Sequence, residues 1–251
     1  MKAKRLFISA FAVGLLAIGA SRISAQEQRE EGYVETDSTS GRRPILLVPG
    51  WWGRLEDFLP LHQRFVRDGW GGEEVMALEF ADPVGSSADH ALELETALKG
   101  LLDRTGAEEV DIVAHSMGSL AVWFYLQNRG NPLRIRRVVF LAAPFQGTVT
   151  AHLAWGEGGR EMVPGSEFLR KLQSGPPPQQ WVEVLTVRTP LDLTVIPWEG
   201  STLLQGRDRL VCCPTHQGLL DHEETYVVIR DFLTRGWRQE EPDLNQGHRT
   251  N

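Results

Sequence analysis

The segment VDIVAHSMGSLAVWFYLQNRG, residues 110–130, decides the fold of this 251-residue chain. Its first part, Val110–Ala114, is a mostly apolar run that predicts a buried β-strand. Its last part, Ser119–Asn128, predicts a helix that ends at Gly130. A strand that turns directly into a helix is the repeating unit of a parallel α/β sheet, so we expect the same alternation in the rest of the chain.

The remaining segments repeat this alternation. Further strands are predicted at residues 44–50, 73–80, 136–142, 181–187 and 209–213. Helices are predicted at residues 58–67, 86–106 and 216–233. Right-handed crossovers between parallel strands would place helices on both faces of the sheet. The sequence therefore predicts an α/β fold with a mostly parallel sheet of about six strands, and a site at the carboxyl ends of those strands.

The two ends of the chain are expected to lie outside this domain. Residues 1–25 combine a basic start, an apolar run and a small residue at the end, which is the pattern of an export signal. An uncleaved anchor is the alternative, although the apolar run is short for a membrane span. Residues 26–42 are predicted to be a flexible lead-in and residues 238–251 a disordered tail, which leaves residues 43–237 for the domain.

The net charge of the chain limits the kinds of partner that it can bind. The chain has 26 basic and 33 acidic residues, a net charge of −7. Removal of residues 1–25 would take away four basic and no acidic residues, and the charge would become −11. An acidic chain lacks the basic face that nucleic acids require. We expect a secreted or periplasmic monomer that binds a small molecule and no nucleic acid.

Ser116 occupies the turn between the predicted strand and helix. Such a turn raises the serine hydroxyl above the sheet and requires small residues two places before and after it. Those places hold Ala114 and Gly118, which gives the nucleophile elbow G-x-S-x-G with alanine in the first position. A serine that only caps the helix is the alternative interpretation. We expect Ser116 to be a nucleophile.

A serine nucleophile needs a base and a group that orients the base, and after an elbow the acid comes before the histidine. Asp192 follows the strand predicted at 181–187, at the correct end of the sheet. Asp208 precedes the next strand, and Asp221 lies a helical turn beyond His216. Asp192 is therefore the expected acid, and an aspartate that only forms a turn is the alternative.

His216 is the expected base. It follows the strand predicted at 209–213 and lies in a loop just before the last helix. His115 adjoins the nucleophile but is expected to point away from it. His152 remains a second candidate because it lies in the segment after the fourth strand.

Negative charge on an acyl oxygen requires backbone N–H donors. Met117, directly after the nucleophile, should supply one. Trp51, in the segment Pro49-Gly50-Trp51-Trp52-Gly53 after the first strand, should supply the other, and Gly50 should support the elbow. Trp52 and Phe145 are expected to line an acyl pocket, with simple loop packing as the alternative.

In these segments the chain resembles the α/β-hydrolase superfamily, and within it the small secreted bacterial lipases and esterases, including the compact Bacillus type. The resemblance covers residues 44–235. It rests on the quoted elbow and on PILLVPGWWG at residue 44, APFQGT at residue 143, D-x-x-V-x-P at residue 192 and H-x-G-L-L at residue 216.

The resemblance implies hydrolysis of carboxylic esters, such as acylglycerols, through an acyl-enzyme, without a cofactor or metal. It also implies a short cap over residues 148–180 and no large lid domain, with transient contact to a lipid surface. An acyltransferase or thioesterase with the same residues is the main rival, and a non-catalytic binding module is a more distant one. Pro49 departs from the family, many members of which have histidine there.

The pair Cys212-Cys213 is not part of the family motif. We expect the two cysteines to be small residues in a buried strand. A vicinal disulfide in an oxidising compartment is the alternative.

Overall fold

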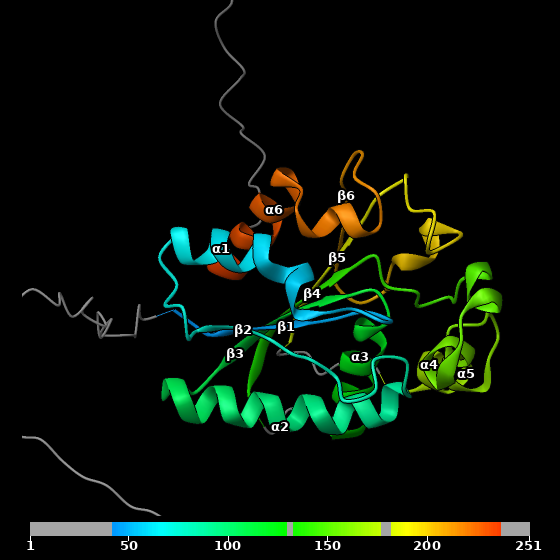
Figure 1. Cartoon of the computed structure of the whole chain (residues 1–251), viewed down its shortest axis with the longest axis horizontal. Coiled ribbons are helices and arrows are strands. Elements are labelled where there is room, and N and C mark those ends of the chain that lie inside the picture. Colours follow the sequence, from blue (N-terminus) through cyan, green and yellow to red (C-terminus); the bar gives the residue numbers. More distant parts are fainter. Residues whose placement is uncertain (1–41, 130–132, 177–181, 237–251) are drawn as a thin grey trace, which may run out of the picture. The chain divides into compact units, whose positions relative to one another are not determined.

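The computed structural model describes residues 42–129, 133–176 and 182–236. In these residues six strands form one sheet in the order β2-β1-β3-β4-β5-β6, and every neighbouring pair is parallel. The predicted α/β fold with a parallel sheet of six strands is confirmed (Figure 1). The predicted export signal and tail lie outside the described residues, and so do Gly130 and Trp181.

The strands are short, and two of the central ones, β1 and β3, are buried at every residue. Their bounds are β1 Ile45–Val48, β2 Val75–Ala77, β3 Val110–His115, β4 Ile135–Leu141, β5 Glu183–Arg188 and β6 Arg207–Leu210. Successive side chains alternate between two hydrophobic cores: Leu46 and Val48 enter one, whereas Ile45 and Leu47 enter the other. A strand buried on both faces needs such a continuous apolar run.

Helices cover both faces of the sheet. Helices α1 (Leu59–Arg67) and α6 (Glu223–Arg235) lie on one face, and α2 (Ser87–Thr105) and α3 (Gly118–Arg129) lie on the other (Figure 1). The hydroxyl of Ser86 accepts the N–H of Asp89, so the predicted cap begins α2. In the described residues no helix is long and apolar enough to cross a membrane.

The described part of the predicted cap segment contains three short helices, η2 (Val149–Leu153), α4 (Gly156–Glu161) and α5 (Glu167–Ser174). The buried carboxylate of Glu161 accepts the N–H of Ser87 at 2.8 Å, in the first turn of α2. This contact fastens the cap to the domain where the helix dipole favours negative charge. Burial nevertheless raises the pKa of Glu161.

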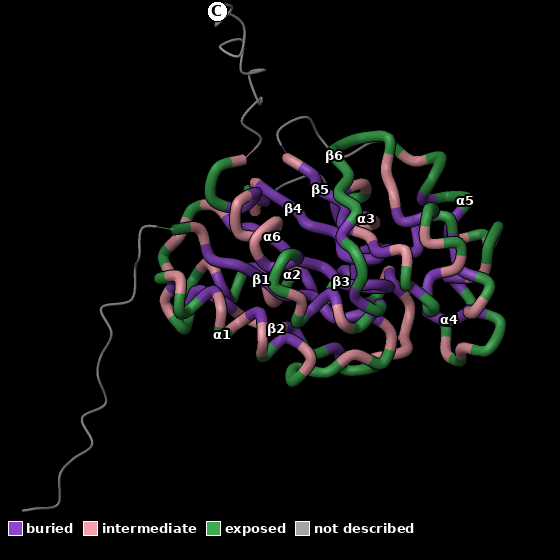
Figure 2. Tube along the Cα trace, turned by 90° about the horizontal axis from the view of Figure 1, so that it is seen from above, coloured by how far each residue is buried: buried purple, intermediate pink, exposed green. Residues whose placement is uncertain are grey.

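The last strand and last helix differ from the prediction. Strand β6 ends at Leu210, before the cysteine pair, and all four of its residues are exposed at the sheet edge (Figure 2). Its sequence is polar because an edge strand has few neighbours to pack against, so hydrophobic periodicity could not locate it. The predicted helix over 216–233 is interrupted: η4 spans Gln217–Leu220, and α6 starts afresh at Glu223.

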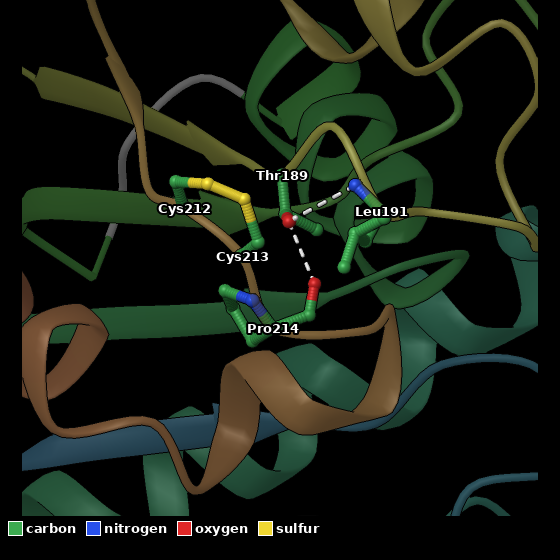
Figure 3. Close-up of a disulfide and its surroundings, with 5 residues drawn as sticks. All are labelled: Thr189, Leu191, Cys212, Cys213 and Pro214. Carbon is green, nitrogen blue, oxygen red and sulfur yellow. Dashed lines mark hydrogen bonds between the residues drawn. A yellow bond between two sulfur atoms is a disulfide. The ribbon is translucent and has the colours of Figure 1, made fainter.

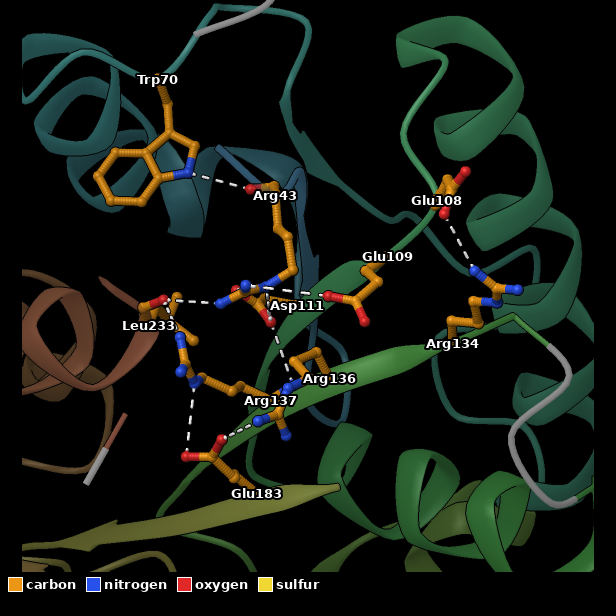
Figure 4. A network of polar contacts seen from close by, with 10 residues as sticks. All are labelled: Arg43, Trp70, Glu108, Glu109, Asp111, Arg134, Arg136, Arg137, Glu183 and Leu233. Carbon is orange, nitrogen blue, oxygen red and sulfur yellow. Dashed lines mark hydrogen bonds and ion pairs between the residues drawn. The ribbon is translucent and has the colours of Figure 1, made fainter. Parts of the chain in front are cut away.

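A polar network closes the amino end of the sheet (Figure 4). The Arg43 side chain donates from Nε to both carboxylate oxygens of buried Asp111 at 3.0 Å. Arg43 and Arg137 also donate to the carbonyl of Leu233 at the end of α6, and Arg137 pairs with Glu183. The network therefore joins β3, β4, β5 and the last helix.

Candidate active site

Ser116 lies on a sharp turn between β3 and α3. Its φ is +52°, a left-handed conformation that is uncommon for a residue with a side chain. The turn is held by the N–H of Ser116, which donates to the carbonyl of Leu141 at 2.8 Å. Such backbone strain persists only where the surroundings enforce it, and it is typical of functional sites.

Small residues make the turn possible. A Cβ added to Gly118 would lie 2.2 Å from the carbonyl oxygen of Pro49, and one added to Gly50 would lie 2.7 Å from the Cβ of Ser116. The elbow and the loop after β1 are therefore in direct contact. The hydroxyl of Ser119 donates to the carbonyl of Ala114, at the end of β3.

Asp192 and His216 form a buried pair. The Nδ1 atom of His216 lies 2.7 Å from Oδ2 of Asp192. The other carboxylate oxygen, Oδ1, accepts the N–H groups of Thr194 and Val195 at 2.8 Å and 2.7 Å. The carboxylate is thus held by its own loop, and its remaining oxygen fixes the imidazole ring.

The competing residues lie elsewhere. Asp208 is within β6, where it pairs with Arg188. The backbone carbonyl and carboxylate of Asp221 accept from Arg64. His152 is an exposed residue of η2 and does not line the cavity described below.

His115 is closer to the site than the sequence predicted. Its ring lies 4.6 Å from the ring of His216, and its Nε2 atom is 3.2 Å from the His216 carbonyl oxygen. Burial, followed by the electrostatic effect of His216, lowers the pKa of His115 well below its usual value. His115 therefore stays neutral and supports the histidine loop. The only sequence feature that could have indicated this role is the position of His115 directly before Ser116.

A cavity of about 410 Å³ opens above these residues. Ser116, His115 and His216 line its floor, and its walls come from the loop after β1, the cap and the segment after Asp192. Asp57 is the one acidic residue of the lining, and no lysine or arginine belongs to it. An uncharged, largely apolar substrate suits this space better than an anion.

Three indole rings join the loop after β1 to the cap. The Nε1–H of Trp51 donates to the carbonyl of Trp155, and the rings of Trp51 and Trp52 each lie 4.4 Å from that of Trp155. Trp51 and Trp155 line the cavity, whereas Trp52 is half-exposed beside them and does not. Trp52 therefore lies at the rim of the cavity.

Phe145 requires a correction. Its ring is buried between Phe140 and Trp123, at 5.2 Å and 5.8 Å, and it is absent from the lining of the cavity that contains Ser116. The ring belongs to the hydrophobic core, and it borders a separate pocket together with Trp123 instead of the expected acyl pocket at Ser116.

The two expected backbone donors are unengaged. Within the described residues, no hydrogen bond occupies the N–H of Trp51 or of Met117, whereas the N–H of Trp52 donates to Pro83. Trp51 lines the cavity, and Met117 directly follows Ser116. Free N–H groups at such positions can bind a negatively charged oxygen.

The cysteine pair also requires a correction. Cys212 and Cys213 are exposed, follow β6 and form a disulfide with each other (Figure 3). The Oγ1 of Thr189, after β5, donates to the carbonyl of Pro214 at 2.6 Å. The pair thus lies in the segment that leads from the sheet edge to His216, and not in a buried strand. In the described part of the chain, no group of histidine, cysteine or acidic residues could hold a metal ion.

Comparison with known proteins agrees with this fold. Residues 43–164 match the family model described as alpha/beta hydrolase fold. Among solved structures, lipase B of Aspergillus fumigatus is similar at a TM-score of 0.68 and 17% identity, over 78% of this chain and 53% of that one. The chain therefore spans about half the length of that lipase.

Two bacterial structures are similar over nearly their full length. A lipase of Bacillus licheniformis in its mature form has a TM-score of 0.67 at 13% identity, over 79% of this chain and 94% of that one. A gene product of Listeria innocua has a TM-score of 0.63 at 16% identity, over 79% and 96%. At such identities the likeness concerns the fold. Over residues 43–164 the chain is similar to the α/β-hydrolase family, and the described chain has an α/β-hydrolase fold.

Proposed function

We propose that this protein is a serine hydrolase that cleaves carboxylic esters, in the manner of lipases and esterases. One observation carries the proposal: His216, whose Nδ1 lies 2.7 Å from the Asp192 carboxylate, lines the same cavity as Ser116 on its left-handed turn. This combination of a serine on a strained turn, a base and an orienting acid is what nucleophilic attack by serine requires.

In the proposed reaction the hydroxyl of Ser116 attacks the ester carbonyl while His216 takes its proton. The N–H groups of Trp51 and Met117 stabilise the oxyanion, and the carbonyl re-forms as His216 gives the proton to the departing alcohol. Water, deprotonated by His216, then attacks the acyl-enzyme and releases the acid and free Ser116. Asp192 stabilises the imidazolium ion in both steps.

The surroundings of the cavity favour a lipid ester. Leu153, Trp155 and Trp52 are 87%, 51% and 48% exposed at or beside its mouth, and Leu193 on the neighbouring loop is 78% exposed. Clustered exposed apolar side chains are typical of contact with a lipid surface or an apolar ligand. We propose that an exported form of the chain acts on such substrates.

The test replaces Ser116 with alanine. Hydrolysis of a p-nitrophenyl ester should fall by about 10⁴- to 10⁶-fold, since no other group can form the acyl-enzyme. Ser201→Ala is the matched control, because Ser201 is equally buried but does not line the cavity. A fluorophosphonate probe should label Ser116 in the wild type.

Activity that survives in Ser116→Ala, or a probe that leaves Ser116 unlabelled, would refute the proposal. Product analysis with added alcohols addresses the rival reaction: formation of new esters in place of free acid would identify an acyltransferase.

A further inference from the structure

Thr148 stands at the base of the cap, directly before η2, and is 3% exposed. Gly147 before it has φ +81°, and a Cβ there would lie 2.8 Å from backbone atoms of Met162 and Pro164. Only glycine fits this turn, so the position of Thr148 is fixed by the backbone. The N–H of Thr148 donates to the carbonyl of Met162, which fixes it further.

The hydroxyl of Thr148 reaches across to the segment after Asp192. Its Oγ1 donates to the carbonyl of Thr194 at 2.8 Å and accepts the N–H of Ile196 at 2.9 Å. The hydroxyl of Thr150 donates to the same carbonyl at 2.5 Å, and the N–H of Val149 donates to the Ile196 carbonyl at 3.0 Å. The cap and this segment are therefore joined on both sides of residue 195.

The same segment holds the carboxylate. The N–H groups of Thr194 and Val195 occupy Oδ1 of Asp192 and leave Oδ2 for His216. Thr194 is thus bonded on one side to the carboxylate and on the other to Thr148. A shift of this residue would move the donors of Asp192, and with them the oxygen that orients the imidazole.

We propose that Thr148 is a positioning residue that fixes the Asp192 carboxylate, and through it His216, from the base of the cap. The inference rests on the proposed function. A hydroxyl is needed because the position must donate one hydrogen bond and accept another. Valine has the same shape but can do neither, so the N–H of Ile196 would lose its hydroxyl acceptor and the Thr194 carbonyl would lose one of its two hydroxyl donors. Serine can do both.

The experiment compares Thr148→Val with Thr148→Ser. The valine variant should lower kcat about 10- to 100-fold, with KM changed by less than about twofold, because the pair is misplaced while valine keeps the shape of Thr148 in the cavity lining. The acid limb of its pH–rate profile should move to lower pH, since a displaced carboxylate stabilises the imidazolium less. The serine variant should restore both. Among the described residues, Asp192 and His115 are the titratable groups in contact with His216, and Asp57 lines the same cavity.

Thr186→Val is the matched control. Thr186 is also buried and its hydroxyl also bonds across strands, to the Arg207 carbonyl and Asp208, but away from the cavity. The Thr186→Val variant should be less stable than the wild type, but the acid limb of its pH–rate profile should not move. This difference separates a positioning role from a merely structural one.

Wild-type kinetics in Thr148→Val, or an equal shift in Thr186→Val, would overturn the inference. If the valine variant does not fold, Thr150→Val, which removes one of the two bonds to Thr194, should give a smaller shift in the same direction, and its absence would also overturn it. An inactive wild type would refute the proposed function instead.

Discussion

The two ends of the parallel sheet each bury an aspartate, and the two aspartates differ in their partners. At the carboxyl end, Asp192 faces His216 beside an open cavity. At the amino end, Asp111 faces Arg43 and the backbone of Arg137 in a closed network (Figure 4). A histidine can gain and lose a proton near neutral pH, whereas arginine stays charged. The first arrangement suits chemistry and the second suits stability.

Strained backbone conformations are also distributed unevenly between the two ends of the sheet. Of the four described residues other than glycine with positive φ, Trp52, Ser116 and Ala142 follow strands β1, β3 and β4. Only Arg134 precedes a strand. The strained turns are therefore concentrated at the end of the sheet that carries the cavity.

Replacement of each aspartate by asparagine is the strongest test of this difference. Asp192→Asn should lower kcat by about 10⁴-fold, because the amide cannot stabilise the imidazolium or select the required tautomer. Asp111→Asn should leave kcat/KM within about twofold, because it lies at the far end of the sheet. Steady-state hydrolysis of one p-nitrophenyl ester measures both, and similar losses in the two variants would contradict the division.

Substitutions at two glycines test the same difference between the two ends of the sheet, with a smaller expected loss of kcat. In Gly118→Ala the new Cβ would meet the Pro49 carbonyl and push the elbow from the loop after β1. We expect a loss of about 2–3 kcal/mol in stability and about 100-fold in kcat. Gly106, with φ +65° before β3, has open space around it, and Gly106→Ala should cost about 1 kcal/mol with unchanged kcat.

Urea unfolding and ester hydrolysis on the two glycine variants give these values. Equal kinetic losses in both would mean that the contact between the elbow and the Pro49 loop has no special role.

The last effect concerns stability alone, through its dependence on pH. Burial raises the pKa of Asp111 from 3.8 to about 6, against the opposing effect of Arg43. Folded Asp111 thus holds its proton more tightly than the unfolded chain does, so its contribution is complete below pH 3.8 and is lost as pH rises through about 6. The loss amounts to about 3 kcal/mol.

The measurement is the difference in unfolding free energy between wild type and Asp111→Asn from pH 3 to pH 7. Other carboxylates contribute equally to both proteins and cancel. A difference that stays constant over this range would show that the arginine pair compensates the burial of Asp111.

The site was predictable to the extent that it depends on residues close together in the sequence. The elbow depends on Ala114, Ser116 and Gly118, which lie within five residues. The positions of Asp192 and His216 could be predicted because each residue comes directly after a predicted strand. Phe145 and β6 could not be placed in this way. The direction of the Phe145 ring depends on Phe140 and Trp123, and β6 has a polar edge sequence.

The sequence by itself determined the alternation of strands and helices, the turn at Ser116 and the order of the three candidate residues, because periodicity and small side chains act locally. The tertiary structure alone decided that His115 supports His216, that the cysteine pair lies exposed before it, and that Thr148 bonds the segment of Asp192. The two hydrogen bonds join residues 101 and 46 positions apart, and the exposure of the cysteine pair depends on packing, which is a property of the folded chain.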